Sequence, residues 1–163
     1  MGNGALTRAV ADVLRESAEA RAKIKEIILA APDIDADIFV REIAPAITSQ
    51  GQLVTLYASS NDWALKDSKK FHGYARAGDP GERLSIAPGI TTIDSSDIET
   101  DFLGHSYFAE SNSIIADMLG ILAGRRKPGE RSNLVPIDIA AGRYWKLMKP
   151  EAPAVPPPPF KPR

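Results

Sequence analysis

One aspartate and one histidine in the sequence could act together as a catalytic pair. Asp62 follows a short apolar run in the segment YASSND, and His105 follows a second run in the segment DFLGHSYF. In a serine hydrolase a carboxylate orients the imidazole and stabilises its protonated form, while the imidazole takes the proton of the serine hydroxyl. Asp62 and His105 therefore predict two members of a Ser-Asp-His triad. Asp33 is the alternative acid, because it too follows an apolar run.

The order of these residues limits where a nucleophile could lie. In hydrolases whose serine sits on a strand-to-helix elbow, the chain order is serine, acid, histidine. The acid and the histidine follow this order here, but no serine precedes the first predicted helix. Possible substitutes are Ser59, Ser60 and Ser106. None of them sits between glycines on such an elbow, so we interpret all three as turn residues.

Helical patterns alternate with short apolar runs along the first 124 residues. The runs that predict buried strands are residues 24–31, 53–58 and 90–93. The segments that predict helices are residues 4–21, 32–51 with a kink or break at Pro45, 61–71 and 113–123. This alternation predicts an α/β fold with a parallel sheet of about three strands and crossover helices. In such sheets ligands and catalytic groups lie at the carboxyl ends of the strands.

The last predicted helix and the segments after it differ in character. Apolar residues line one face of that helix, and Gly124 is its expected end; the face consists of Ile115, Met118, Leu119 and Leu122. Residues 1–124 are therefore predicted to form the domain, and residues 125–149 an irregular extension in which 144–147 could dock as a small strand or turn. Residues 150–163 hold seven of the 13 prolines and predict an extended, disordered tail.

Composition excludes several classes of protein. The 163 residues suffice for one domain, and the net charge of −1 gives no electrostatic footprint for nucleic acid or an anionic membrane. No cysteine is present, which excludes disulfides, cysteine-ligated metal sites and a cysteine nucleophile. The start of the chain is not typical of a secretory signal, so we expect a cytoplasmic location for the chain as written.

Three aspartates imitate the start of a calcium-binding loop. They are Asp33, Asp35 and Asp37, but Ile38 and Ala44 occupy the positions where such a loop has glycine and glutamate. Helix capping and loop hydrogen bonds are the better interpretation. With two histidines in the chain, a histidine-rich metal site is excluded as well. We therefore predict neither a metal nor a cofactor.

Five longer segments carry a resemblance to a known family. They are MGNGAL, ILAAPDIDADIF, VTLYASSNDWAL, HGYARAGD and GITTIDSSDIETDFLGHSYF. From about Met1 to Leu122 the chain resembles the C-terminal half of a bacterial, largely uncharacterised, esterase/lipase-like family of α/β-hydrolases. The resemblance implies an α/β-hydrolase fold, with His105 as the catalytic histidine and Asp62 as the acid.

The same resemblance places the nucleophile outside the sequence. The family's elbow reads approximately His-Ser-Met-Gly-Asn, and Met1, Gly2 and Asn3 match its last three positions. The serine would then precede Met1, whose backbone N–H would be at the oxyanion position. The intact parent is expected to hydrolyse carboxylic esters or related small acyl compounds. We expect this chain to be inactive, as a gene fragment or the product of a mis-called start.

A rival interpretation makes the chain a non-catalytic binding module. Such a module would keep a remnant pocket at the strand ends and use Pro156–Pro159 to engage an SH3- or WW-like groove. The missing serine favours this interpretation if the short form is itself expressed and folded. The compartment of the intact parent stays open, since any signal peptide would lie upstream.

Overall fold

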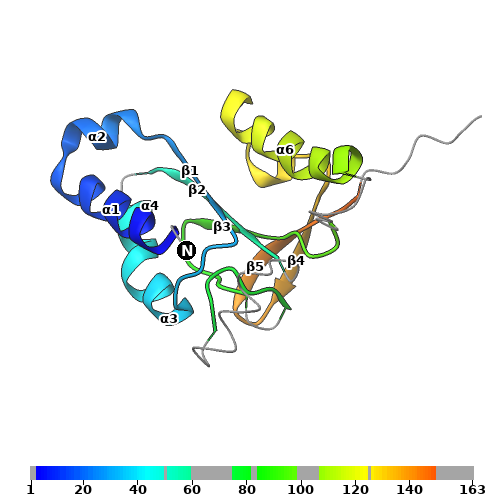
Figure 1. Cartoon of the computed structure of the whole chain (residues 1–163), viewed down its shortest axis with the longest axis horizontal. Coiled ribbons are helices and arrows are strands. Elements are labelled where there is room, and N and C mark those ends of the chain that lie inside the picture. The colour runs from blue at the N-terminus through cyan, green and yellow to red at the C-terminus, as the bar shows by residue number, and fades with distance from the viewer. Residues whose placement is uncertain are drawn as a thin grey trace, which may run out of the picture.

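The computed structural model describes residues 3–49, 51–59, 75–81, 84–98, 107–124 and 126–149, without the side chains of residues 3 and 107–112. Within these residues the centre of the molecule is a five-stranded sheet of order β1-β2-β3-β5-β4 (Figure 1). The strands are β1 Glu26–Ala30, β2 Leu53–Ala58, β3 Ile90–Asp94, β4 Leu134–Ile139 and β5 Gly142–Leu147. Strands β1, β2, β3 and β5 run parallel to one another, and β4 runs antiparallel to β5.

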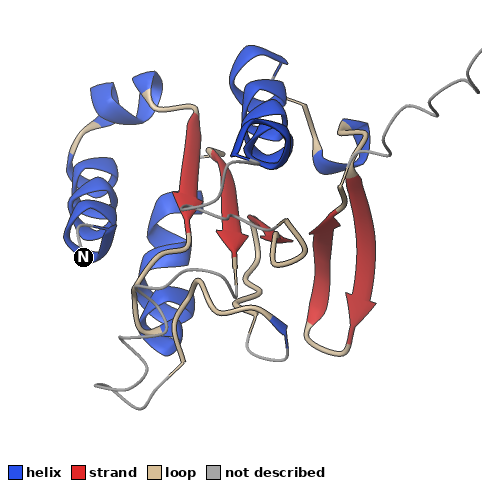
Figure 2. Ribbon diagram, turned by 45° about the vertical axis from the view of Figure 1, so that its right-hand side comes forward, coloured by secondary structure: helices blue, strands red, loops and turns tan. Residues whose placement is uncertain are grey.

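Helices cover both faces of this sheet (Figure 2). One face carries α1 Asn3–Glu16, α3 Ala36–Ile38, the π-helical turn η1 Phe39–Ile43 and α4 Ala44–Thr48, with α2 Ala18–Lys23 following α1. The other face carries α6 Tyr107–Gly124, and the 3-10 turn η3 Pro128–Glu130 leads from there toward β4. None of the described helices is long and apolar enough to cross a membrane.

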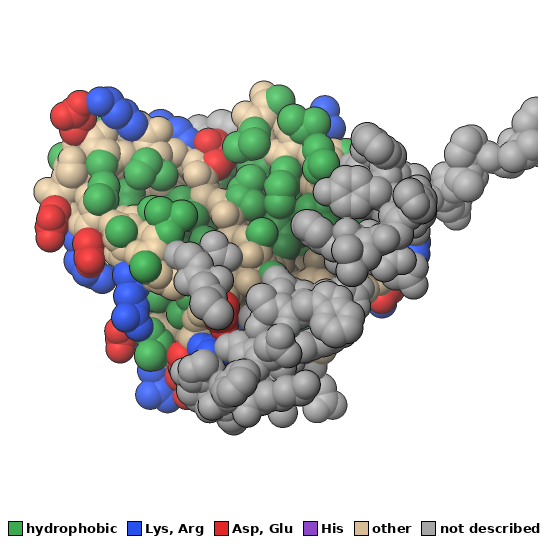
Figure 3. All heavy atoms as spheres, viewed as in Figure 1, with side chains coloured by type: hydrophobic (Ala, Val, Ile, Leu, Met, Phe, Trp, Pro, Cys, Tyr) green, Lys and Arg blue, Asp and Glu red, His purple; other side chains and the backbone are tan. Residues whose placement is uncertain are grey.

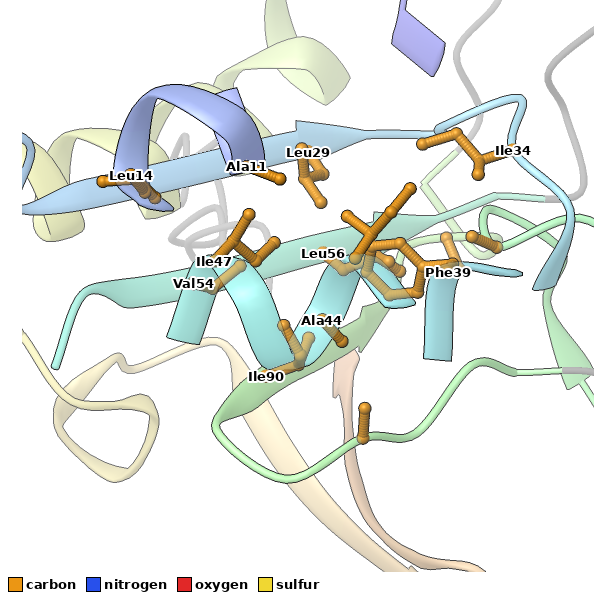
Figure 4. Packing of buried hydrophobic residues seen from close by; sticks show 14 residues of the cluster. Ala11, Leu14, Leu29, Ile34, Phe39, Ala44, Ile47, Val54, Leu56 and Ile90 are labelled. Atoms are coloured by element: carbon orange, nitrogen blue, oxygen red, sulfur yellow. The ribbon is translucent and has the colours of Figure 1, made fainter. Parts of the chain in front are cut away.

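The alternation of side chains along each strand produces two cores. On β2 Val54 and Leu56 point to the core beneath α1 and α4, whereas Tyr57 points to the core beneath α6. Figure 4 shows the first core, in which Phe39 and Ile47 pack against the sheet. The buried residues of the second core are Tyr57, Ile93, Ile98, Leu134 and Leu147.

The predicted strands are confirmed, and two helical segments divide where a residue interrupts the pattern. Residues 4–21 were expected to be one helix, but Ser17 leaves the helical conformation and its hydroxyl accepts the N–H of Ala20 at 3.1 Å as the cap of α2. The break expected at Pro45 is present, because the π-helical turn η1 ends directly before α4, where Pro45 lies in the first turn. A proline there needs no N–H partner.

The helix expected at 113–123 begins earlier and buries a different face. It starts at Tyr107, and its buried residues include Ser113, Asp117 and Ile121, one helical turn apart. The expected face is wrong for the larger part, since Ile115, Leu119 and Leu122 are exposed. Figure 3 shows hydrophobic side chains gathered over the part of the surface that α6 forms. Apolar periodicity misleads here because the polar Asp117 has partners inside the protein.

The irregular extension expected at residues 125–149 is wrong for residues 134–139, whereas the small strand considered at 144–147 is confirmed within β5. Residues 134–147 form the β4–β5 hairpin, and β5 adds a parallel strand to the three that were predicted. The sequence pattern did not indicate strand β4, because Pro136 interrupts it and most of its residues are exposed. A proline is compatible with an edge strand, where its missing N–H has no ladder partner to lose. The segments 61–71 and 150–163 lie outside the described residues.

Candidate functional site

The carboxyl ends of β1, β2 and β3 meet at one edge of the sheet. Ala30 is level with Tyr57, and Ala58 is level with Asp94. The chain continues from these ends into Asp33 after β1 and Ser59 after β2. The edge therefore has the position that a parallel α/β sheet gives to its ligands and catalytic groups.

The expected triad residues are placed by chain connectivity alone. Asp62, His105 and Met1 lie outside the described residues, as does His72. Along the chain, Asp62 comes four residues after the last residue of β2, and His105 lies between the end of β3 and the start of α6. Both residues thus belong to segments that leave the same edge of the sheet.

Beneath this edge, two loops pair with one another through their backbones. The loop after β1 and the segment 75–79 are joined by an isolated antiparallel bridge between Asp35 and Arg76. The amide of Ala77 donates to the carbonyl of Ile34 at 2.8 Å. Further backbone bonds run from Ala36 to Ala75 at 3.0 Å and from Gly78 to Pro32 at 3.1 Å. The two loops are therefore held together as firmly as a short piece of sheet.

The alternative acid, Asp33, is engaged in this loop pair. Its Oδ1 lies 3.1 Å from Nε of Arg76, and the two side chains are 25 % and 7 % exposed. Asp79 is fully buried, and its Oδ2 accepts the backbone N–H of Arg76 at 3.2 Å. A carboxylate that neutralises a buried guanidinium has a structural task of its own. The segment HGYARAGD places Arg76 and Asp79 on either side of Gly78, but it carries no signal for the contact between Arg76 and Asp33.

Close backbone contact accounts for the glycine in this segment. A Cβ atom added to Gly78 would come 2.7 Å from the backbone carbon of Ala31, so a side chain there requires the backbone to move. Ala31 has a φ of 40°, which is unfavourable for a residue with a side chain. Backbone strain of this kind often accompanies functional sites, where the surrounding structure maintains it.

The three aspartates of the loop after β1 have separate tasks. Asp33 pairs with Arg76, whereas Asp35 caps α3 by accepting the N–H of Ile38 at 3.0 Å. Asp37 lies exposed in the first turn of α3. The capping expected for this cluster is confirmed at Asp35. Among the described residues, no group of three His, Cys, Asp or Glu side chains could hold a metal ion.

Directly after β3, Ser95 links the ends of β2 and β3 through hydrogen bonds. Its backbone N–H and its hydroxyl both donate to the carbonyl of Ala58, each at 2.9 Å. Asp97 lies beyond it and pairs with Lys146 of β5 at 2.8 Å. The hydrogen bond that Lys146 donates to the carboxylate of Asp97 raises the pKa of Lys146. Ser95 therefore holds β2 and β3 in register at the point where both strands end.

A second buried ion pair lies under α6, away from the loop pair. Oδ2 of Asp117 accepts hydrogen bonds from the hydroxyl of Tyr57 at 2.5 Å and from Nη1 of Arg131 at 2.9 Å. Burial, and then the hydrogen bond to Asp117, raise the pKa of Tyr57 far above its ordinary value. This cluster joins β2, α6 and the start of the C-terminal hairpin. Sequence reasoning missed it, because Asp117 and Arg131 are polar residues whose partners are distant in the chain.

A comparison with models of protein families shows which family the chain belongs to. Residues 1–126 match the model of a family described as "Alpha/beta hydrolase of unknown function (DUF900)". The chain belongs to this family of α/β-hydrolases. The matched range contains β1, β2, β3 and α6 together with Asp62 and His105, whereas the β4–β5 hairpin lies beyond it. Searches among curated proteins and among solved structures find no match.

Proposed function

We propose that the chain supplies the acid and the general base of an α/β-hydrolase that cleaves carboxylic esters or related acyl compounds. His105 takes the proton of a serine nucleophile and returns it to the leaving group. Asp62 orients the imidazole and stabilises its protonated form. The nucleophile is a serine directly before the position of Met1 in a longer parent, and Met1 contributes its backbone N–H to the oxyanion hole. This chemistry requires no cofactor.

One observation carries the proposal: in a chain of this hydrolase family, the segments with Asp62 and His105 leave neighbouring strands at the carboxyl edge of a parallel sheet. The order acid and then histidine agrees with a nucleophile that comes earlier in the chain. Strands β1 and β2 lie side by side and parallel, and α3, η1 and α4 connect them, as in a β-α-β unit.

The ion pair at Asp33 supports Asp62 as the acid. Orienting a histidine requires a carboxylate with an oxygen available to the imidazole. The carboxylate of Asp33 faces the buried guanidinium of Arg76 at 3.1 Å and contributes to neutralising its charge. If Asp33 accepted a hydrogen bond from a histidine instead, it would neutralise the charge of Arg76 less well. Asp62 therefore remains the better candidate for the triad.

Labelling with a fluorophosphonate, which reacts with activated serines, tests this function. We expect no labelling of the 163-residue chain, because it lacks the nucleophile. A longer form, read in frame from the coding sequence upstream of Met1, is expected to contain His-Ser there and to become labelled on that serine. His105→Ala and Asp62→Asn should slow the labelling. Stoichiometric labelling of the 163-residue chain, or a longer form without a reactive serine at that position, would contradict the proposal.

A further inference from the structure

A small polar hollow lies between the last turns of α6 and the chain that leads through η3 into β4 (Figure 2). Its volume is about 60 Å³. That is roughly twice a water molecule's share of liquid water, and far below the 300–1,000 Å³ or so of a pocket for a drug-sized ligand. The hollow therefore suits one small ion or one chemical group. Its polar lining consists of Asp117, Arg126, Arg131, Ser132 and Asn133.

Arg131 brings an unsatisfied donor to this polar hollow. Its side chain is 3 % exposed, and its Nη1 donates to Oδ2 of Asp117 at 2.9 Å. Its Nε is also buried, but it has no hydrogen-bond partner within the part of the chain that the structure describes. A buried donor without an acceptor is costly, and more so when it belongs to a charged group. Since Arg131 lines the polar hollow, a ligand there is in place to supply the acceptor.

Arg126 brings a second cation, because α6 ends in small residues. The backbone N–H of Arg126 donates to the carbonyl of Gly120 at 3.2 Å, so the chain folds back over the last turn of the helix. A Cβ atom added to Gly124 would lie 3.2 Å from Cγ and 3.3 Å from Nε of Arg126, and one added to Gly120 would lie 3.8 Å from its Cδ. The two glycines thus leave the surface along which this side chain lies.

The charges around the polar hollow favour an anion. Asp117 is the carboxylate of the lining, and its Oδ2 already accepts hydrogen bonds from Tyr57 and Arg131. Two guanidinium groups against one carboxylate leave an excess of positive charge. Guanidinium groups bind phosphate through paired N–H donors, and Ser132 and Asn133 add neutral donors. The exposed Ser132 leaves the polar hollow open to solvent.

We propose that the polar hollow binds a phosphate group, with Arg126 and the Nε–H of Arg131 as its charged donors. A phosphate group carries a charge of about −1.5 to −2 at pH 7, which matches two guanidinium groups better than the single charge of a carboxylate does. The group is either inorganic phosphate or the phosphate of a larger molecule whose remainder stays in solvent beside Ser132. This site uses neither Asp62 nor His105, so it is independent of the proposed hydrolysis.

Titration of the 163-residue chain with inorganic phosphate tests the proposal, with the ionic strength held constant by sodium chloride. We expect saturable binding with a dissociation constant of about 1 mM or lower by calorimetry. In ¹H–¹⁵N spectra the Nε–H signal of Arg131 should shift in step with occupancy, and the thermal midpoint should rise because the ligand binds the folded state. Glycerol 3-phosphate distinguishes the two sources: equal affinity indicates the phosphate of a larger molecule, and binding of inorganic phosphate alone indicates the free ion.

Two exposed positions test the site without breaking the buried pair of Asp117 and Arg131. Arg126→Gln removes the second cation, and Ser132→Asp places a carboxylate at the opening. Each should weaken phosphate binding about tenfold or more, whereas Arg126→Lys, which keeps the charge but loses the paired donors, should have an intermediate affinity. The matched control is Arg143→Gln, an exposed arginine on β5 that should leave the affinity unchanged.

Three results would overturn the proposal. The first is a response to phosphate that rises linearly without saturation, as expected of general ionic screening. The second is saturable binding during which the Nε–H signal of Arg131 does not move, since the anion would then lie elsewhere. The third is an affinity that Arg126→Gln and Ser132→Asp leave as unchanged as Arg143→Gln does. Circular dichroism of each variant at the titration temperature confirms that the comparison is made between folded proteins.

Discussion

The Asp117–Arg131 pair lies between regular elements, whereas the Asp33–Arg76 pair lies between two loops. Asp117 extends from α6 to Tyr57 on β2 and to Arg131 before β4, so the cluster joins parts that are distant in the sequence. Asp33 and Arg76 join two loops beneath the carboxyl edge. One pair lies within the packing of the fold, and the other lies at the edge where catalysis is proposed. The same chemical pair should therefore affect global stability in one place and local order in the other.

The largest effect is expected from Arg131→Ala. It leaves the carboxylate of Asp117 buried without its cation, and the side chains of the pair are 3 % and 4 % exposed. Removing one partner of such a pair lowers the free energy of unfolding by about 3–5 kcal/mol. Urea denaturation followed by circular dichroism measures it, with Arg143→Ala in the exposed pair as the control. A loss below about 1 kcal/mol, typical of surface pairs, would place Asp117–Arg131 outside the core of the fold.

Tyr57→Phe should have the next largest effect, about 1.5–3 kcal/mol, because it removes a buried hydrogen bond to a charged group. It should also change the dependence of stability on pH. Since folding raises the pKa of Tyr57, its contribution is complete below about pH 10, the ordinary value, and is lost as the pH rises above it. The variant should lose this part of the alkaline decline in unfolding free energy. Tyr144→Phe on β5 is the control, and an equal response from it would refute the assignment.

Gly78→Ala tests the pair of loops that contains Asp33 and Arg76. The added methyl group displaces the backbone of Ala31, which should cost about 1–3 kcal/mol. Gly120→Ala is the matched control: its Cβ meets no atom closer than 3.8 Å, and alanine favours a helix, so stability should stay equal or rise. Thermal unfolding compares the two. Equal midpoints would show that the loops do not require the close approach.

The smallest effect is expected from Asp138→Asn. Arg143 lowers the pKa of Asp138 by hydrogen bonding, but both side chains are exposed to solvent, which screens the pair. Lowering the pH through the carboxylate range removes whatever this pair contributes, and we expect no measurable change in the thermal midpoint. A clear loss of stability would mean that the position of a pair in the fold does not determine its contribution, which would end the distinction between the two buried pairs.

The parallel strands could be predicted because their signals are local. Leu53–Ala58 is an apolar run bounded by residues that end a strand, and it forms β2 with the expected limits. Strand β4 could not, since Pro136 and its exposed residues give no apolar alternation, and of β5 only residues 144–147 were considered as a small strand. The buried face of α6 was missed for a related reason. Asp117 is buried because of Tyr57 and Arg131, and no pattern within the helix carries that information.

Some residues of the candidate site could likewise be predicted from the sequence, and others could not. Asp62 and His105 could be proposed from their positions after strands and from the family resemblance, and they stay predictions. The pair of Asp33 and Arg76 could not, because it depends on two loops more than 40 residues apart meeting beneath the sheet edge. Asp33 alone resembled a possible catalytic acid, and its partner shows why that interpretation is the weaker one.

The nitrogen shifts of His105 in the 163-residue chain and in Asp62→Asn test the central claim most directly. An aspartate that orients the imidazole keeps the proton on one ring nitrogen, and the asparagine variant should lose that preference. We predict a single tautomer in the unchanged chain and a mixture in Asp62→Asn. Identical shifts in the two proteins would contradict the assignment of Asp62 and His105 as the acid and base of this hydrolase.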